Sequence, residues 1–444
     1  MATQREIGSG SGESEYNEIG MRSVIGSVGS FLLIFLVIPP WLFAQGMEEQ
    51  QVFGGEETVL RFGLDSTSNW WILTQPYERY MRLYVNGYKS AEAEYIMRPV
   101  FSPDGLHWGT VTYFQNTVSV LLDGQTLELA YTIAYDLQFA DDGLTASVVG
   151  YIGGQQELVR FQFADGEWKQ KETVPLPQAF EGSIVQDRSL TRFLCRVSEG
   201  NQFSVLMGDR TFGPFDQIHH LRWWQDSLPL FAARNGDWWA VYLGSEPLIS
   251  SIDTVFSIQL NRDRSVAVIV YKRYQLSYIA KLAPDGQLQQ TQGWDKVEDV
   301  KLHPSATAYG ALVQWRNQHY FLLNGTRYPV RRQHTKLQML YDGSGYYCLE
   351  CRQLCDLMVN GERLSLQLRA SSQLQSFLFL PQSQMFAYVY GPNFYVHSLK
   401  RRQTVLSYQY DRFSAIVYNW YAQSVEVLAK RGNLLYLLRY SLVP

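Results

Sequence analysis

The stretch Pro99-Val-Phe-Ser-Pro-Asp-Gly105 contains the unit that determines the fold of this chain. Its first residues end a short apolar strand. Ser-Pro-Asp-Gly then forms a turn, because Pro fixes φ and because Asp and Gly accept the backbone conformations that turns need. A related stretch, Asp136-Leu-Gln-Phe-Ala-Asp-Asp-Gly143, follows, and its Phe139 lies 38 residues after Phe101. A period of this length predicts stacked β-modules, as in solenoids and propellers.

The pattern recurs through the rest of the 444-residue chain at intervals of 37 to 46 residues. The apolar residues that end the first strand of each unit are Phe62, Phe101, Phe139, Val185, Trp223, Leu260, Leu302, Leu340, Phe379 and Tyr418. A glycine turn follows 21 to 26 residues later in most units, at Gly87, Gly124, Gly208, Gly244, Gly286, Gly325 and Gly361. Five of these glycines follow Asn or Asp, and four of the five, Gly87, Gly124, Gly325 and Gly361, end a Val/Leu-Asn/Asp-Gly sequence. Asn-Gly and Asp-Gly pairs favour the type I′ hairpin. The Phe139 unit lacks this glycine, and its interval of 46 residues predicts an inserted loop around Lys169 to Pro177.

The segments between the turns are short and rich in β-branched and aromatic residues, as in Val266-Ala-Val-Ile-Val-Tyr271. Such runs predict an all-β protein. About forty residues with four short strands correspond to one propeller blade. We therefore predict a single β-propeller over residues 56–444, built from four-stranded blades of about 39 residues, with eight to ten blades. Ten repeats are counted, and two smaller rings are the alternative arrangement.

The turn at Val100 to Gly105, followed by the Leu122-Asp-Gly124 hairpin, resembles the WD40-like repeats of bacterial TolB-type propellers. The likeness extends to the units of Phe139, Leu302 and Leu340, although Ser-Pro-Asp-Gly is intact only once. The resemblance implies a propeller fold and a binding role in the periplasm or at the cell surface. It supplies no catalytic residues.

The N-terminal region has two parts. Residues 1–20 are polar and rich in Gly, Ser and Glu, so we expect a disordered extension. Residues 21–45 begin with Met21-Arg22, continue with an apolar run at 31–38, and reach Ala44 after two prolines. This order is typical of a secretory signal peptide, with an uncleaved inner-membrane anchor as the alternative. Met21 is a second candidate for the start of the chain. We expect a periplasmic or secreted protein.

Three of the four cysteines, Cys348, Cys351 and Cys355, lie at a spacing that invites a zinc interpretation. The surrounding residues have a strand pattern, and side chains three apart on a strand point to opposite faces, which argues against a metal site. A hairpin loop at 352–354 would instead bring Cys351 opposite Cys355. In an oxidising compartment this pair can form a disulfide, and two half-buried thiols are the alternative.

Signals for catalysis are missing from the sequence. It contains no Gly-x-Ser-x-Gly, His-Glu-x-x-His or P-loop motif. The aspartates beside glycine, among them Asp104, Asp142, Asp237 and Asp342, are explained by turn formation. His219 and His220 are adjacent, so on a strand they face opposite ways and cannot share a metal. We expect no catalytic residues, no metal and no cofactor.

The formal net charge of −4 and the lack of a basic block argue against nucleic acid as a partner. The tryptophan doublets at 70–71, 223–224 and 238–239 are expected to be core residues, with a rim of exposed aromatic rings as the alternative. We predict a monomeric, non-catalytic propeller that binds a protein partner through the loops of one face. Any membrane contact would come from an uncleaved N-terminal segment. The second hypothesis is a carbohydrate-active propeller, either a lectin or a glycosidase-like protein.

Overall fold

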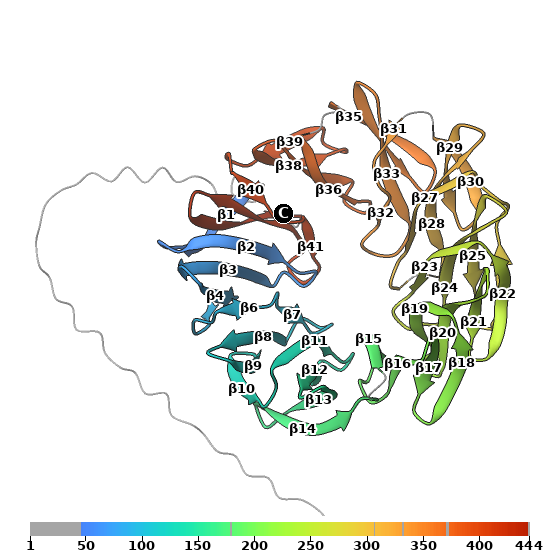
Figure 1. The fold of residues 1–444 in the computed structure, drawn as a ribbon. Helices are drawn as coiled ribbons and strands as arrows, with labels where there is room; N and C mark the ends of the chain where they lie inside the picture. The colour runs from blue at the N-terminus through green and yellow to red at the C-terminus, as the bar shows by residue number, and fades with distance from the viewer. Residues whose placement is uncertain (1–45, 178–179, 306, 331–332, 370–372, 443–444) are drawn as a thin grey trace, which may run out of the picture. The chain divides into compact units, whose positions relative to one another are not determined.

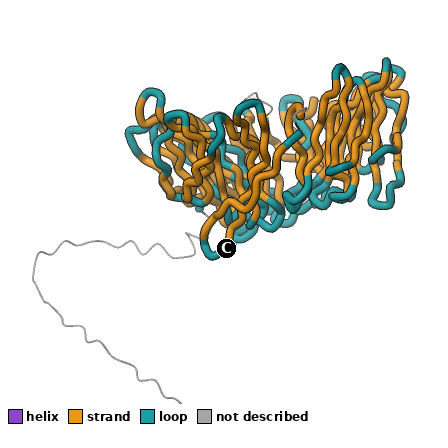
Figure 2. Tube along the Cα trace, turned by 60° about the horizontal axis from the view of Figure 1, so that its bottom comes forward, coloured by secondary structure: helices purple, strands orange, loops and turns teal. Residues whose placement is uncertain are grey.

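The computed structural model describes residues 46–177, 180–305, 307–330, 333–369 and 373–442. The expected N-terminal extension (1–20) and signal peptide or anchor (21–45) lie outside these ranges. Residues 44–444 form one compact unit. All of its regular elements are strands (Figure 2), and the described residues therefore contain no helix that could cross a membrane.

The described strands form ten antiparallel sheets, which are the blades of a ring (Figure 1). Blades 1 to 5 consist of β2 (Thr58–Leu64), β3 (Trp70–Tyr77), β4 (Tyr80–Val85) and β5 (Tyr88–Lys89); β6 (Tyr95–Ile96), β7 (Val100–Phe101), β8 (Trp108–Phe114), β9 (Thr117–Leu122) and β10 (Gln125–Leu129); β11 (Ile133–Phe139), β12 (Thr145–Ile152), β13 (Gln155–Ala164) and β14 (Glu167–Pro175); β15 (Phe180–Gln186), β16 (Phe193–Glu199), β17 (Gln202–Met207) and β18 (Arg210–Phe215); and β19 (Gln217–Trp224), β20 (Leu228–Asn235), β21 (Trp238–Leu243) and β22 (Glu246–Ile252).

Blades 6 to 10 follow the same order, except that the last blade also takes in β1. They consist of β23 (Thr254–Leu260), β24 (Ala267–Arg273), β25 (Leu276–Leu282) and β26 (Leu288–Gln290); β27 (Lys296–Leu302), β28 (Tyr309–Trp315), β29 (Gln318–Leu323) and β30 (Thr326–Val330); β31 (Gln333–His334), β32 (Gln338–Met339), β33 (Tyr346–Cys351), β34 (Leu354–Val359) and β35 (Glu362–Arg369); β36 (Leu374–Leu380), β37 (Met385–Tyr390), β38 (Asn393–Ser398) and β39 (Gln403–Leu406); and β40 (Arg412–Phe413), β41 (Val417–Asn419), β42 (Ser424–Arg431), β43 (Leu434–Ser441) and β1 (Met47–Gly54). The prediction of an all-β propeller with up to ten blades is confirmed.

The first strand of each blade faces the middle of the ring, and the first strands of successive blades contact one another, as β19, β23 and β27 do (Figure 1). Because the strands alternate in direction, the loops gather along two opposite faces (Figure 2). Face I carries the turns between first and second strands and the hairpins between third and fourth strands. Face II carries the turns between second and third strands and the connections from blade to blade.

The Asn-Gly and Asp-Gly hairpins lie on face I and have the conformation that the sequence predicts. Asn86 and Gly87 have φ values of 48° and 91°, both in the left-handed region that a type I′ turn requires. The Asn86 Oδ1 also accepts a hydrogen bond of 2.9 Å from the Trp70 N–H, where the second strand of the blade begins. Asp123 accepts the equivalent bond from Trp108 at 2.8 Å. The repeated side chain therefore ties its hairpin to the neighbouring strand.

Blade 3 differs from the prediction of an inserted loop around Lys169 to Pro177. Residues 167–175 form the regular strand β14, and its partner β13 has ten residues. The hairpin between them is Asp165-Gly166, with φ values of 56° and 82°. The extra residues of this unit therefore lengthen two paired strands, and the glycine turn is present but displaced along the chain.

The ring closes through the two ends of the described chain. Strand β1 pairs antiparallel with β43 and is the outermost strand of blade 10. The propeller therefore begins at Met47, before the predicted boundary at residue 56. The first strand of blade 1 and the final strand lie in adjacent blades, where Leu64, Leu428 and Leu437 share one buried cluster.

Candidate functional site

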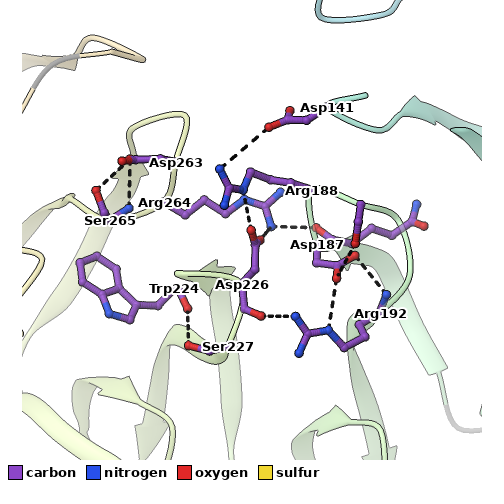
Figure 3. Close-up of polar contacts among 12 residues, drawn as sticks. Asp141, Asp187, Arg188, Arg192, Trp224, Asp226, Ser227, Asp263, Arg264 and Ser265 are labelled. Atoms are coloured by element: carbon purple, nitrogen blue, oxygen red, sulfur yellow. Dashed lines mark hydrogen bonds and ion pairs between the residues drawn. The ribbon is translucent and has the colours of Figure 1, made fainter. Parts of the chain in front are cut away.

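A polar network joins neighbouring blades on face I (Figure 3). Asp226, in the turn between β19 and β20, accepts hydrogen bonds from Arg188 Nε at 2.5 Å and from Arg264 Nη1 at 2.6 Å. Arg188 comes from the turn before β16, and Arg264 comes from the turn before β24. One carboxylate therefore holds together the turns of blades 4, 5 and 6.

Asp187 anchors the same network from inside a turn. Its carboxylate accepts backbone N–H groups from Thr191 at 2.8 Å and from Arg192 at 3.0 Å. Burial alone would raise the pKa of Asp187, but these hydrogen bonds and those from the Ser189, Thr191 and Arg192 side chains lower the pKa below its ordinary value. Asp187 is therefore ionised at neutral pH and fully engaged, so the network is suited to fixing turns and unsuited to acid catalysis.

The aspartates that the sequence assigns to turn formation act in this way on face I. Asp104, Asp142 and Asp342 each accept a hydrogen bond from the N–H two residues further on, at 3.0, 2.8 and 2.9 Å. This part of the prediction is confirmed for these three. Asp237 lies exposed in the turn between β20 and β21 on face II.

A second set of aspartates, which the sequence analysis missed, lies on face II. Each immediately precedes the first strand of its blade and accepts a hydrogen bond from an N–H in the turn between the second and third strands of that blade. The pairs are Asp216 with Gly236 at 2.7 Å, Asp253 with Gln275 at 3.4 Å, Asp295 with Arg316 at 2.5 Å and Asp411 with Gly432 at 2.7 Å. The sequence feature that could have identified this set is an Asp directly before the first apolar strand of each of these units.

Face II also presents five aromatic rings at the strand ends of blades 1 and 2, which we call the aromatic patch: Tyr77, Tyr80, Tyr95, Tyr113 and Phe114. Tyr77, Tyr95 and Phe114 are 65%, 50% and 39% exposed, and Tyr80 and Tyr113 are half-buried. The Tyr80 and Phe114 ring centroids are 6.3 Å apart between the two blades, and those of Tyr95 and Tyr113 are 5.9 Å apart within blade 2. The patch is the candidate binding site.

The other exposed large apolar side chains of the described residues also lie more often on face II than on face I. On face II, the exposed ones outside the patch include Ile133, Ile152, Trp238, Tyr274, Leu354 and Tyr408. On face I, they are Leu106, Leu144, Trp420 and Tyr421. Face II is therefore the more apolar of the two loop faces.

The tryptophan doublets divide between core and surface. Trp223 and Trp224 are both buried, and each packs against a different neighbouring blade, as the core interpretation predicts. Trp71 is buried and Trp70 is half-buried. For Trp238 the core interpretation is wrong: it is 48% exposed, because it is the first residue of β21 and directly follows a turn on face II.

The adjacent histidines have separate surroundings. The His219 ring lies edge-on to Trp239 at 4.9 Å between centroids, and His220 Nε2 lies 3.2 Å from the Val255 carbonyl oxygen. Burial is the main cause that lowers the pKa of His220, which is therefore neutral at pH 7. No group of three metal-ligating side chains is found in the described ranges.

Cys351 and Cys355 face each other across the hairpin between β33 and β34, the register that the sequence analysis expects, and the structure joins them in a disulfide. Cys195 and Cys348 are buried thiols, and burial raises the pKa of each to about 12. These two cysteines are therefore protonated and shielded.

No family model and no curated protein matches the chain. Solved structures with a similar fold include the β-propeller domain of the Trilobed protease from Pyrococcus furiosus, at 10% identity and a TM-score of 0.36 over 62% of this chain and 97% of that one. A eukaryotic initiation factor has 12% identity and a TM-score of 0.46 over 87% and 96%. TolB from Acinetobacter baumannii has 11% identity and a TM-score of 0.27 over 53% and 62%. At such low similarity, none of these likenesses carries an argument about activity or partners.

Proposed function

We propose that this chain is an exported, non-catalytic β-propeller of the bacterial TolB-like, WD40-like type that binds a protein partner through face II. The observation that carries the proposal is the aromatic patch. Its five rings come from two adjacent blades, and Tyr77 and Tyr80 oppose each other across one hairpin. Aromatic side chains dominate the energetics of protein interfaces, since they bury a large area at little entropic cost.

The scaffold supports binding because it holds the patch rigidly. Tyr95 is the first residue of β6, which pairs with β8, and Phe114 is the last residue of β8. Tyr113 is anchored by its hydroxyl, which donates a hydrogen bond of 2.5 Å to the Ala134 carbonyl oxygen in blade 3. A partner would therefore meet rings that are already ordered, which reduces the entropic cost of binding.

Two described aspartates on face I are unsuited to hydrolysis. A glycosidase needs one carboxylic acid with a raised pKa beside a second carboxylate. In Asp104 and Asp187 the pKa is displaced in the opposite direction. For both, hydrogen bonds outweigh the opposing effect of burial and lower the pKa. Neither can serve as a general acid near neutral pH.

Export is part of the proposal and rests on the sequence of residues 21–45, with cleavage near Ala44 releasing a periplasmic or secreted monomer. The apolar run at 31–38 is shorter than the ~20 residues of an ordinary membrane span. An uncleaved inner-membrane anchor is the alternative outcome.

The test compares the full chain with the double variant Tyr77→Ser/Tyr95→Ser and with Tyr421→Ser. Tyr421 is 89% exposed on face I, so it controls for the loss of an exposed tyrosine. Affinity capture from cell envelopes identifies the partner, and calorimetry with the purified partner then measures the dissociation constant. We expect the double variant to lose at least about 2 kcal/mol of binding free energy, or roughly thirtyfold in affinity. The Tyr421→Ser variant should bind as the wild type does.

Equal affinity of the double variant and the wild type would refute the role of the patch. A glycan array gives the second readout. If an oligosaccharide binds the wild type and is lost in the double variant while no protein partner is found, the carbohydrate-binding hypothesis replaces the proposal.

A further inference from the structure

A groove of about 810 Å³ lies between blades 8 and 9, away from the aromatic patch. One wall is formed by β35, with Leu366 and Leu368, and the other by β37 to β39, with Tyr388 and Tyr395. Its volume falls within the range of roughly 300–1,000 Å³ that is typical of small-molecule sites. The groove has a mixed lining, with leucines and tyrosine rings on its walls and Arg402, His397 and Thr404 among its polar groups.

Large buried rings lie between other blades. Between blades 2 and 3, Trp168 of β14 is buried and donates a hydrogen bond of 2.8 Å from Nε1 to Asp123. Between blades 6 and 7, Trp294 is buried in the cluster that the two blades share. No described tryptophan lines the groove between blades 8 and 9, and its wall on β35 is formed by leucines.

The wall on blade 9 carries a pair of stacked tyrosines. The Tyr388 and Tyr395 rings face each other with centroids 4.9 Å apart and an angle of 6° between their planes. Both residues are half-buried, so the pair is partly open to the groove. A further aromatic ring can extend this stack or meet it edge to face, with the leucines of β35 on its other side.

The rim supplies the charge. Arg402 lies at the edge of the groove and is exposed, and no described carboxylate forms an ion pair with it. His397 also lines the groove, with Nδ1 2.8 Å from Thr404 Oγ1, and burial lowers the pKa of its imidazole, so it is neutral at pH 7. Among the described side chains that line the groove, the guanidinium of Arg402 is therefore the cation near neutral pH, and a carboxylate complements it in charge and geometry.

We propose that this groove binds a small aromatic carboxylate, with its ring against Tyr395 and its carboxylate at Arg402. This site is separate from face II and takes a different class of ligand from the partner proposed above.

The probe is 2-naphthoate, titrated into the full chain by isothermal calorimetry. We expect saturable binding of one molecule per chain. Arg402→Gln should weaken it about tenfold or more, because a charge-assisted hydrogen bond is lost. Arg401→Gln is the matched control: Arg401 lines a different pocket on the other side of blade 9, so affinity should be unchanged. The neutral analogue 2-naphthamide should bind the wild type about tenfold more weakly than the carboxylate does.

A second variant tests the location independently of charge. Leu364→Trp places a large ring in the groove, because Leu364 pairs with Leu357 on the face of β35 that packs against blade 9. This variant should abolish naphthoate binding while the circular dichroism spectrum stays that of the wild type. If it does not fold, Leu368→Trp on the same wall replaces it. The proposal is overturned if naphthoate shows no saturable binding, or if the folded tryptophan variant binds as the wild type does. Binding of dodecanoate without binding of naphthoate would likewise overturn the aromatic assignment.

Discussion

Ring closure can be tested at one side chain of β1. Phe53 is 8% exposed and packs with Val59, Ile72 and Leu435, while its ring meets that of Tyr84 at 5.0 Å. Replacing a buried Phe by Ala typically costs about 3–5 kcal/mol. Because β1 is the outermost strand of its blade and can relax into the space, we expect Phe53→Ala to fall at the lower end, about 3 kcal/mol.

The loss should appear first as local opening at the seam. Strand β1 pairs with β43, so its detachment exposes the amides of β43 to solvent. A loss of about 3 kcal/mol corresponds to roughly a hundredfold faster hydrogen exchange there. Exchange is measured by mass spectrometry on peptides that cover residues 434–441, with Gln51→Ala as the control, since the Gln51 side chain is exposed on the same strand. If the two variants exchange at the same rate in β43, the closure described for this ring is incorrect.

Three further predictions concern single groups. Hydrogen bonds hold the pKa of Asp187 below its ordinary value, so its stabilising effect is present above the unfolded-state pKa of about 4 and is lost as the pH falls below it. Asp187→Asn should therefore lower the free energy of unfolding by about 2 kcal/mol at pH 7, and by less at pH 3, in urea titrations; an equal loss at both pH values would contradict this sign. The native protein, purified without reductant, should show two free thiols after denaturation, from Cys195 and Cys348, whereas four would show that Cys351 and Cys355 are not bonded. Intact mass of the native protein should place its N-terminus near residue 45, and recovery of a soluble cytosolic form that starts at Met1 or Met21 would argue against export.

The blade architecture was predictable because its determinants are local. The Asn86-Gly87 and Asp123-Gly124 pairs specify a turn through backbone conformation alone, and the regular spacing of such turns indicates the number of blades. The same turn pattern gave a wrong prediction for blade 3. Its glycine turn was not found at the usual interval, which suggested an inserted loop, but Asp165-Gly166 forms the hairpin after a longer strand. Strand length depends on pairing with a neighbour, which a turn signal does not report.

The candidate site was less predictable because it depends on which strand ends remain uncovered. The sequence does not distinguish Trp224, which is buried between blades, from Trp238, which is exposed at a strand start. The Tyr80 and Phe114 rings belong to different blades, and only the folded ring brings them together. The groove beside Tyr395 is likewise lined by strands of two different blades, which only the folded ring brings together.

The seam between β1 and β43 also constrains how the protein is made. Gly54 pairs with Leu434, which is translated 380 residues later. At about 5–20 residues per second, β1 waits roughly 20–80 s for its partner to leave the ribosome. Throughout that time its backbone groups can pair with the wrong strand or with another nascent chain. Correct assembly therefore depends on whatever shields this first strand during synthesis, and a shortage of that protection would show as misfolded chains even when the finished ring is stable.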